Sequence, residues 1–250
     1  MIRILLLLMA LAMPAVAEEV VAGLSQNRVA ITANFDGSEI IVYGAVRREA
    51  PVPDGPLDII VTVQGPSTPV TVRRKERVAG IWVNREAVEI DLAPGFYAVA
   101  TTAPLAEVLS ETENLRHRIT IPRAIRAVGV AGSAEDAPAF TEALMRLRSA
   151  EGAYQLAEGA VEVAQETLFR TDVVLPANLS EGAFRVRIFL LRGGAVIDWH
   201  ETVIEVRKEG LERFLHRLAF EQPLIYGILA LVLAIAAGWG ASALFRFIRA

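Results

Sequence analysis

The sequence predicts a mainly β fold with two small Ig-like β-sandwich units, a helical connector between them and a single C-terminal transmembrane helix. Three observations lead to this prediction. Short alternations of apolar and polar residues recur about every 8–12 residues between Gly, Pro and Asp turns, which is typical of β-sandwiches. Within the exported part, helical composition is found in a middle section, 104–152. The last apolar stretch, 223–245, contains no charged residue.

Residues 1–17 are predicted to be a cleaved signal peptide. Arg3 precedes a short apolar stretch, and Ala15–Ala17 supplies the small residues that signal peptidase reads. The stretch is too short to span a bilayer comfortably as a helix. The alternative is an uncleaved anchor, which would also place the following residues outside the cytoplasm.

Residues 18–103 are predicted to form the N-terminal β-sandwich unit. Trp82, in one of its short strands, is expected in the core under the sheet. The expected strands are 39–46, 57–65, 69–78, 81–84, 87–92 and 95–102, separated by turn signals such as Asp36-Gly37.

Residues 104–152 are predicted to be a partly helical connector. Segment 104–118 has helical composition, and 137–152 is the stronger helix. Phe140, Leu144 and Leu147 follow helical spacing and are expected to share one face.

Residues 153–207 are predicted to form the second β unit. Segment 161–176 holds either two strands or one long bent strand. The clearest hairpin joins 182–192 to 195–207 through Gly193-Gly194, a pair suited to a two-residue turn. Its first strand is expected to present one apolar face made of Phe184, Val186, Ile188 and Leu190.

The C-terminal part is predicted to bind the lipid bilayer. Residues 223–245 would span it, because about 20 apolar residues suffice for a helix to cross. Residues 208–222 have the spacing of an amphipathic juxtamembrane helix, which would lie among the headgroups, prolong the span or pack on the body. Residues 246–250 would be a short tail.

The span carries small residues four positions apart: Ala230, Ala234, Gly238 and Ser242. Such a stripe lets another helix approach closely. It predicts helix packing within the membrane, either with a copy of this chain or with a polytopic membrane protein. The alternative is that small residues are simply common in spans of this composition.

Orientation follows from the predicted signal peptide. It places the chain in a bacterial inner membrane as a single-pass protein, with the bulk periplasmic and the tail cytoplasmic. The positive charges that flank the span, counted alone, favour the opposite orientation. However, a long domain behind a signal peptide is translocated largely regardless of its charge.

Composition excludes several classes of function. The chain has no cysteine, so disulfides and thiolate metal sites are excluded. The net charge is −4 and no large basic face is indicated, so no nucleic-acid partner is expected.

Candidate catalytic chemistry is sparse, and we predict no catalytic residue, no metal site and no cofactor. His117, His200 and His216 are the three imidazoles of the sequence. Asp198 and His200 stand two apart on a strand and therefore point to the same side, which could orient an imidazole. The simpler interpretation is an exposed polar pair with Trp199 turned inward.

The C-terminal third contains "LFRTDVVLPANLSEGAFRVRIFLLRGGAV", "QPLIYG" (222–227) and "AGWGAS" (237–242). These segments resemble the alphaproteobacterial transmembrane protein family Alph_Pro_TM. The resemblance covers nearly the whole chain and implies a signal, an exported region and one C-terminal span. It also implies a gene near that of a sulfite-exporter-type permease, and it brings no activity that can be assigned to residues here.

Three hypotheses for the function follow. The first is a non-enzymatic accessory module for a membrane protein such as a permease-type transporter. The second is a tethered periplasmic domain that binds a solute or an ion. The third is an enzyme that uses Asp198 and His200.

Overall fold

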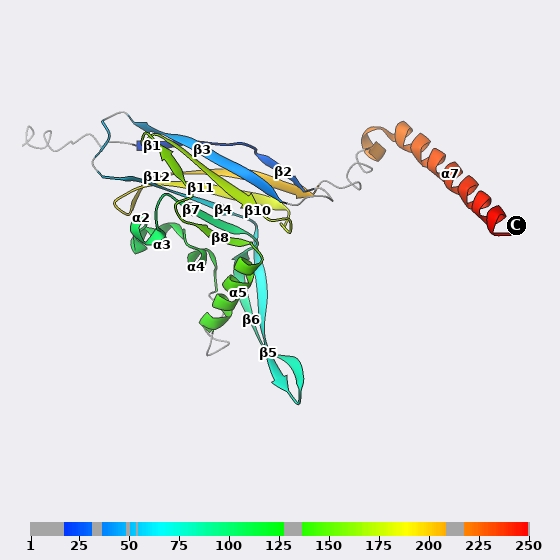
Figure 1. Ribbon diagram of the computed structural model, residues 1–250, viewed down its shortest axis with the longest axis horizontal. Coiled ribbons are helices and arrows are strands. Elements are labelled where there is room, and N and C mark those ends of the chain that lie inside the picture. Colours follow the sequence, from blue (N-terminus) through cyan, green and yellow to red (C-terminus); the bar gives the residue numbers. More distant parts are fainter. Residues whose placement is uncertain are drawn as a thin grey trace, which may run out of the picture. The chain divides into compact units, whose positions relative to one another are not determined.

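The computed structural model describes residues 18–31, 37–48, 51–53, 55–127, 137–208 and 218–249. They comprise a β-rich body and one long C-terminal helix (Figure 1). The predicted mainly β chain with a single apolar C-terminal helix is therefore confirmed. The predicted signal peptide lies outside the described residues.

Two stacked sheets form the centre of the body (Figure 1). In the first sheet the strand order is β1 (Glu18–Leu24), β3 (Ser38–Arg48), β10 (Leu168–Leu175) and β9 (Glu162–Ala164). In the second it is β2 (Arg28–Ile31), β12 (Ala195–Lys208), β11 (Gly182–Arg192), β4 (Leu57–Gln64), β7 (Tyr97–Thr101) and β8 (Tyr154–Ala157). Strands β7 and β8 pair parallel, and the pairs β1–β3, β3–β10, β10–β9, β12–β11, β11–β4 and β4–β7 are antiparallel.

The two predicted sandwich units differ from what is observed, because strands from 18–103 and 153–207 share both sheets. Strand β3 pairs with β10, and β4 pairs with β11. The body is thus one interleaved unit rather than two units with a connector. The physical reason is that a period of two tells which face of a strand is buried but not which strand lies beside it.

The hairpin of β11 and β12 agrees with the prediction. Gly193 and Gly194 both have positive φ, 57° and 79°, as a tight two-residue turn requires. The predicted apolar face of β11 is completely buried between the sheets. Segment 161–176 holds two strands, β9 and β10.

Helices cover the other face of the second sheet (Figure 1). They are α2 (Leu105–Val108), α3 (Glu111–His117), α4 (Ile121–Ala124) and α5 (Ala137–Ala150). Phe140 and Leu144 of α5 join Phe189 and Leu191 of β11 in one apolar cluster, so β11 is buried on both faces. Leu147, the third member of the predicted helix face, is instead 53% exposed.

Strands β5 (Ser67–Val78) and β6 (Ile81–Pro94) form a separate two-stranded ribbon that extends from the body (Figure 1). The two short strands predicted at 81–84 and 87–92 are one continuous strand. The ribbon's turn is Ala79-Gly80, with φ of 49° and 88°. Trp82 beside this turn is 68% exposed, so its predicted core position is wrong. The alternation of apolar residues indicated a strand packed on the body. The strand instead continues past the body, so Trp82 has no core to pack against.

Helix α7 (Pro223–Arg249) contains the predicted span. Its window Pro223–Gly240 has a mean hydropathy of 2.0 and is entirely unburied. Twenty-seven residues correspond to roughly 40 Å of helix, more than the roughly 30 Å of a hydrocarbon core. Of the predicted juxtamembrane helix, 209–217 lies outside the described residues, and 218–221 is helical.

Candidate functional site

The predicted pair Asp198 and His200 lies on β12, on the side that faces the first sheet. The Asp198 carboxylate accepts a hydrogen bond from the backbone N–H of Val20 on β1, at 2.8 Å. Asp198 therefore satisfies an amide of the opposite sheet, and no contact between it and the His200 ring is found within the described residues. This hydrogen bond gives Asp198 a structural role, so no catalytic role is needed to account for its position.

Trp199 lies on the opposite side of β12 from the pair and is 49% exposed. Its ring centroid is 6.4 Å from that of His117 on α3 and 6.5 Å from that of Phe189 on β11. Trp199 is thus half exposed rather than turned inward as expected. A register shift of the hairpin between Leu190 and Leu191 precedes this part of β12, and such irregularities re-aim side chains.

A polar cluster that sequence reasoning missed joins α3 to the second sheet. Arg187 of β11 donates from Nη1 to the His117 carbonyl at 2.7 Å and from Nη2 to the Arg118 carbonyl at 3.3 Å. The Tyr97 hydroxyl donates to the Ile119 carbonyl at 2.8 Å. Burial raises the pKa of Tyr97, and the nearby Arg187 partly opposes this shift.

The His117 side chain completes this cluster. Its Nε2 is 3.3 Å from a carboxylate oxygen of Glu113, one turn earlier on α3, and Arg116 contacts the other oxygen at 2.8 Å. These contacts hold the end of α3, where Arg118 adopts the left-handed conformation with φ of 52°. Within the described ranges no group of three or more His, Asp or Glu is placed to hold a metal ion.

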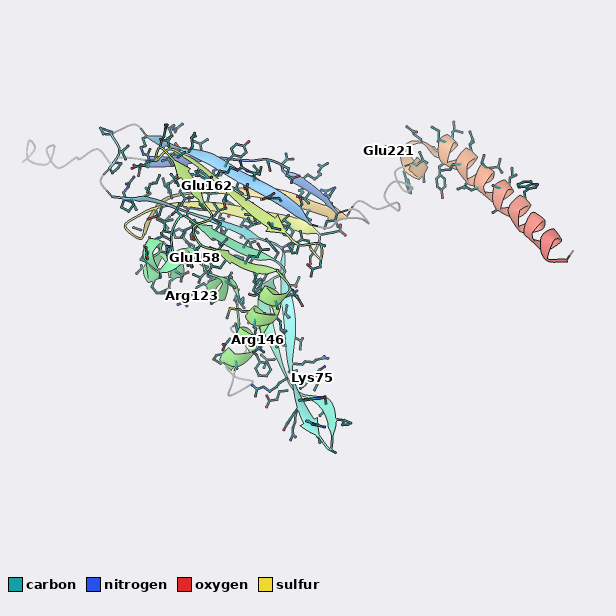
Figure 2. The ribbon with its side chains drawn as sticks, viewed as in Figure 1. Lys75, Arg123, Arg146, Glu158, Glu162 and Glu221 are labelled. Atoms are coloured by element: carbon teal, nitrogen blue, oxygen red, sulfur yellow. The ribbon has the colours of Figure 1, made fainter. Side chains whose placement is uncertain are left out.

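The β5–β6 ribbon carries exposed apolar and basic side chains close together. We call residues 73–87 the arm. Its tip consists of Val78, Ile81 and Trp82, which are 41%, 64% and 68% exposed. Exposed basic side chains precede the tip on β5, and Figure 2 shows Lys75 among them. An exposed apolar tip next to cations is a candidate contact surface.

The predicted helix-packing stripe lies along α7. Ala230, Ala234 and Gly238 are exposed, and a Cβ added at Gly238 would meet no atom within 4 Å. Ser242 is also on α7, but its side chain lies outside the described ones. The role of the stripe stays a prediction. His216 lies outside the described residues as well.

A β-rich body followed by one helix of spanning length defines the class of membrane-anchored proteins with a single C-terminal span. Residues 19–247 match the family described as "Putative transmembrane protein (Alph_Pro_TM)", and the chain belongs to this family. The resemblance predicted from the sequence is thereby confirmed.

Other comparisons add little. No curated protein matches the chain. Among solved structures, the sporulation control protein Spo0M of Bacillus subtilis is similar at 12% identity, with a TM-score of 0.27. The match covers 77% of this chain and 50% of Spo0M, so the chain spans about half the length of that protein. A likeness this distant carries no argument about function.

Proposed function

We propose that the chain is a non-enzymatic accessory module that α7 anchors in the bacterial inner membrane, with its β-rich body in the periplasm. Its partner would be a polytopic membrane protein of permease type. The periplasmic side follows from the predicted signal peptide, since exported domains behind such a signal cross the membrane largely regardless of charge.

The observation that carries the proposal is the composition of α7 along its length. Its apolar window is unburied, and small residues recur on one side at Ala230, Ala234 and Gly238. In lipid, helix association depends on close packing rather than on the hydrophobic effect, so small residues mark the side that another helix approaches. The body is consistent with the proposal, because Asp198 of the candidate pair accepts a hydrogen bond from the Val20 amide of the opposite sheet.

Site-specific photo-crosslinking in native membranes tests the proposal. A photoreactive residue replaces Ala234 in one variant and Val232 in the other. Two residues correspond to about 200° around a helix, so the two positions report opposite sides. We expect a crosslink to a polytopic protein from position 234 and little from 232. Crosslinks only between copies of this chain, or equal crosslinks from both positions, would contradict the proposal.

The second candidate function is a tethered solute- or ion-binding domain. The Arg187 cluster favours it, because the Nε of this guanidinium is buried and finds no acceptor within the described residues. An oxyanion is the ligand class that such a donor would suit. Thermal unfolding of the full chain in nanodiscs, with and without sulfate, sulfite or phosphate, tests it. A melting temperature that no oxyanion raises would remove this candidate.

A further inference from the structure

The arm carries its charges asymmetrically. Because side chains alternate along a strand, Arg73, Lys75 and Arg77 of β5 share one face. Trp82 stands directly opposite Arg77 in the antiparallel register, and Asn84 stands opposite Lys75, so both belong to that face. We call this the basic face of the arm.

The acidic residues of the arm belong to other positions and are paired. Glu86 lies 3.3 Å from Arg74, and Glu76 lies 3.3 Å from Arg85. The three cations of the basic face have no carboxylate partner among the described residues. The basic face therefore presents three unneutralised positive charges and one exposed indole ring.

Contacts at the base of the arm determine which of its two faces is left uncovered by α5. Val72 and Val88 are buried in the cluster with α5, and the Arg74 guanidinium lies 4.9 Å from the ring centroid of Phe140. These side chains belong to the face opposite the three cations. From Val72 to Val78 the strand extends about 20 Å. The tip thus projects beyond the apolar cluster, and the basic face points away from α5.

This combination suits the surface of an anionic bilayer. Tryptophan concentrates at the level of lipid headgroups because its ring is amphipathic. A basic residue near an anionic surface contributes about 1 kcal/mol of attraction. We propose that the arm is a second membrane contact, in which Trp82 and Ile81 enter the headgroup layer while the basic face binds lipid phosphates.

The anchor makes such a weak contact effective. The 14 residues 209–222 join the body to α7, and at no more than about 3.6 Å each they keep the body within roughly 50 Å of the bilayer. Binding of the arm is then intramolecular in character, and a high effective concentration compensates for low intrinsic affinity. This inference goes beyond the proposed function, because it holds whether or not α7 packs against a partner helix.

A second copy of the chain fits the arm less well. Two arms brought together by their basic faces would oppose three cations to three cations, and like charges that face each other are destabilising. The edges of the arm are lined by charged side chains, which discourages strand pairing between copies. Charge complementarity therefore favours lipid over self-association.

The absence of cysteine makes the test direct. An Ala79→Cys variant of the full chain carries a polarity-sensitive fluorophore at the turn of the arm, and a Val174→Cys variant carries it on β10. Both are placed in nanodiscs of phosphatidylcholine alone, or of equal parts phosphatidylcholine and phosphatidylglycerol. We expect a blue shift of emission only from position 79, only with phosphatidylglycerol, and reduced by salt.

Charge variants separate lipid binding from other causes. Lys75→Gln and Arg77→Gln should each lower the bound-to-free ratio of the arm about fivefold, as loss of roughly 1 kcal/mol implies. Arg170→Gln on β10 is the matched control and should leave the shift unchanged. Emission from position 79 that is the same in both nanodiscs would overturn the proposal. Energy transfer between labelled copies, or crosslinks from the arm only to a protein, would also overturn it.

Discussion

Arg192 on β11 and Glu18 on β1 form an ion pair across 174 positions of sequence, with Nη2 at 3.0 and 3.1 Å from the two carboxylate oxygens. Arg48 on β3 donates to the same carboxylate. The Glu18 side chain is 3% exposed and that of Arg192 is 12% exposed. The pair therefore joins the first sheet to the second where water is largely excluded.

Removal of Arg192 should destabilise the body strongly. In Arg192→Met the Glu18 carboxylate keeps Arg48 but loses its second cation. Removing one partner of a buried ion pair costs about 3–5 kcal/mol, and we expect the lower end of this range. Urea unfolding followed by circular dichroism measures the loss. Further replacement of Glu18 by Gln should add to the loss, because the Arg48 side chain, only 9% exposed, would then lose its carboxylate partner.

The neighbouring pair provides a matched control for this prediction. Glu19 follows Glu18 on β1 and Arg47 precedes Arg48 on β3, but the side chains of Arg47 and Glu19 are 63% and 53% exposed. Arg47→Met should cost less than about 1 kcal/mol, since exposed ion pairs contribute little. Equal losses from the two arginine substitutions would show that burial does not govern the Glu18 pair.

The docking of α5 should depend on Leu144 and not on Leu147. Leu144 is 4% exposed within the apolar cluster, whereas Leu147 is 53% exposed. Leu144→Ala should lower the free energy of unfolding by about 2–5 kcal/mol, as large-to-small changes in a core do. Leu147→Ala should change it by no more than about 0.5 kcal/mol. Thermal unfolding of both variants checks this, and a reversed order would refute the assigned face.

Alkaline pH should destabilise the body through Tyr154. Its hydroxyl donates to the Pro94 carbonyl at 2.8 Å, and burial raises its pKa from 10.0 to about 12. Because the folded state holds this proton more tightly, its contribution is complete below pH 10.0 and is lost as pH rises toward about 12. Tyr154→Phe should flatten this part of the profile of unfolding free energy against pH. An unchanged slope would contradict the assignment, and Tyr43→Phe is the control.

The proposed periplasmic position of the body predicts a labelling pattern. Val174 on β10 is 57% exposed, and the chain has no cysteine of its own. In intact spheroplasts, a membrane-impermeant maleimide should modify Val174→Cys. It should modify a cysteine at Arg249 only after the membrane is permeabilised. The reverse pattern would place the body in the cytoplasm.

The sequence predicted features that depend on neighbours along the chain. The β11–β12 hairpin follows from alternation on both sides of Gly193-Gly194, and α7 follows from an uninterrupted apolar stretch. Each of these two patterns lies entirely within one continuous segment of the chain. The same locality explains why the strands were identified largely at their correct positions while their assignment to two units was not.

Features that depend on pairing between distant segments were not predictable in this way. Nothing near Arg187 indicates that its guanidinium meets the end of α3, 69 and 70 positions earlier. The exposure of Trp82 depends on how far the body extends beneath the ribbon. The alternation of apolar and polar residues around Trp82 carries no information about that. An unusual density of Arg and Lys at 73–77 is the one local signal that could have indicated a solvent-facing arm.

Membrane fractionation tests the central claim most directly. The full chain and a chain that ends at Lys208 are produced in the native host, and the membranes are washed with high salt. The full chain should remain in the washed membranes, because α7 spans them. The shortened chain should leave with the wash, since only the weak, salt-sensitive contact of the arm would remain. Release of the full chain by salt, or retention of both chains, would contradict a single C-terminal anchor.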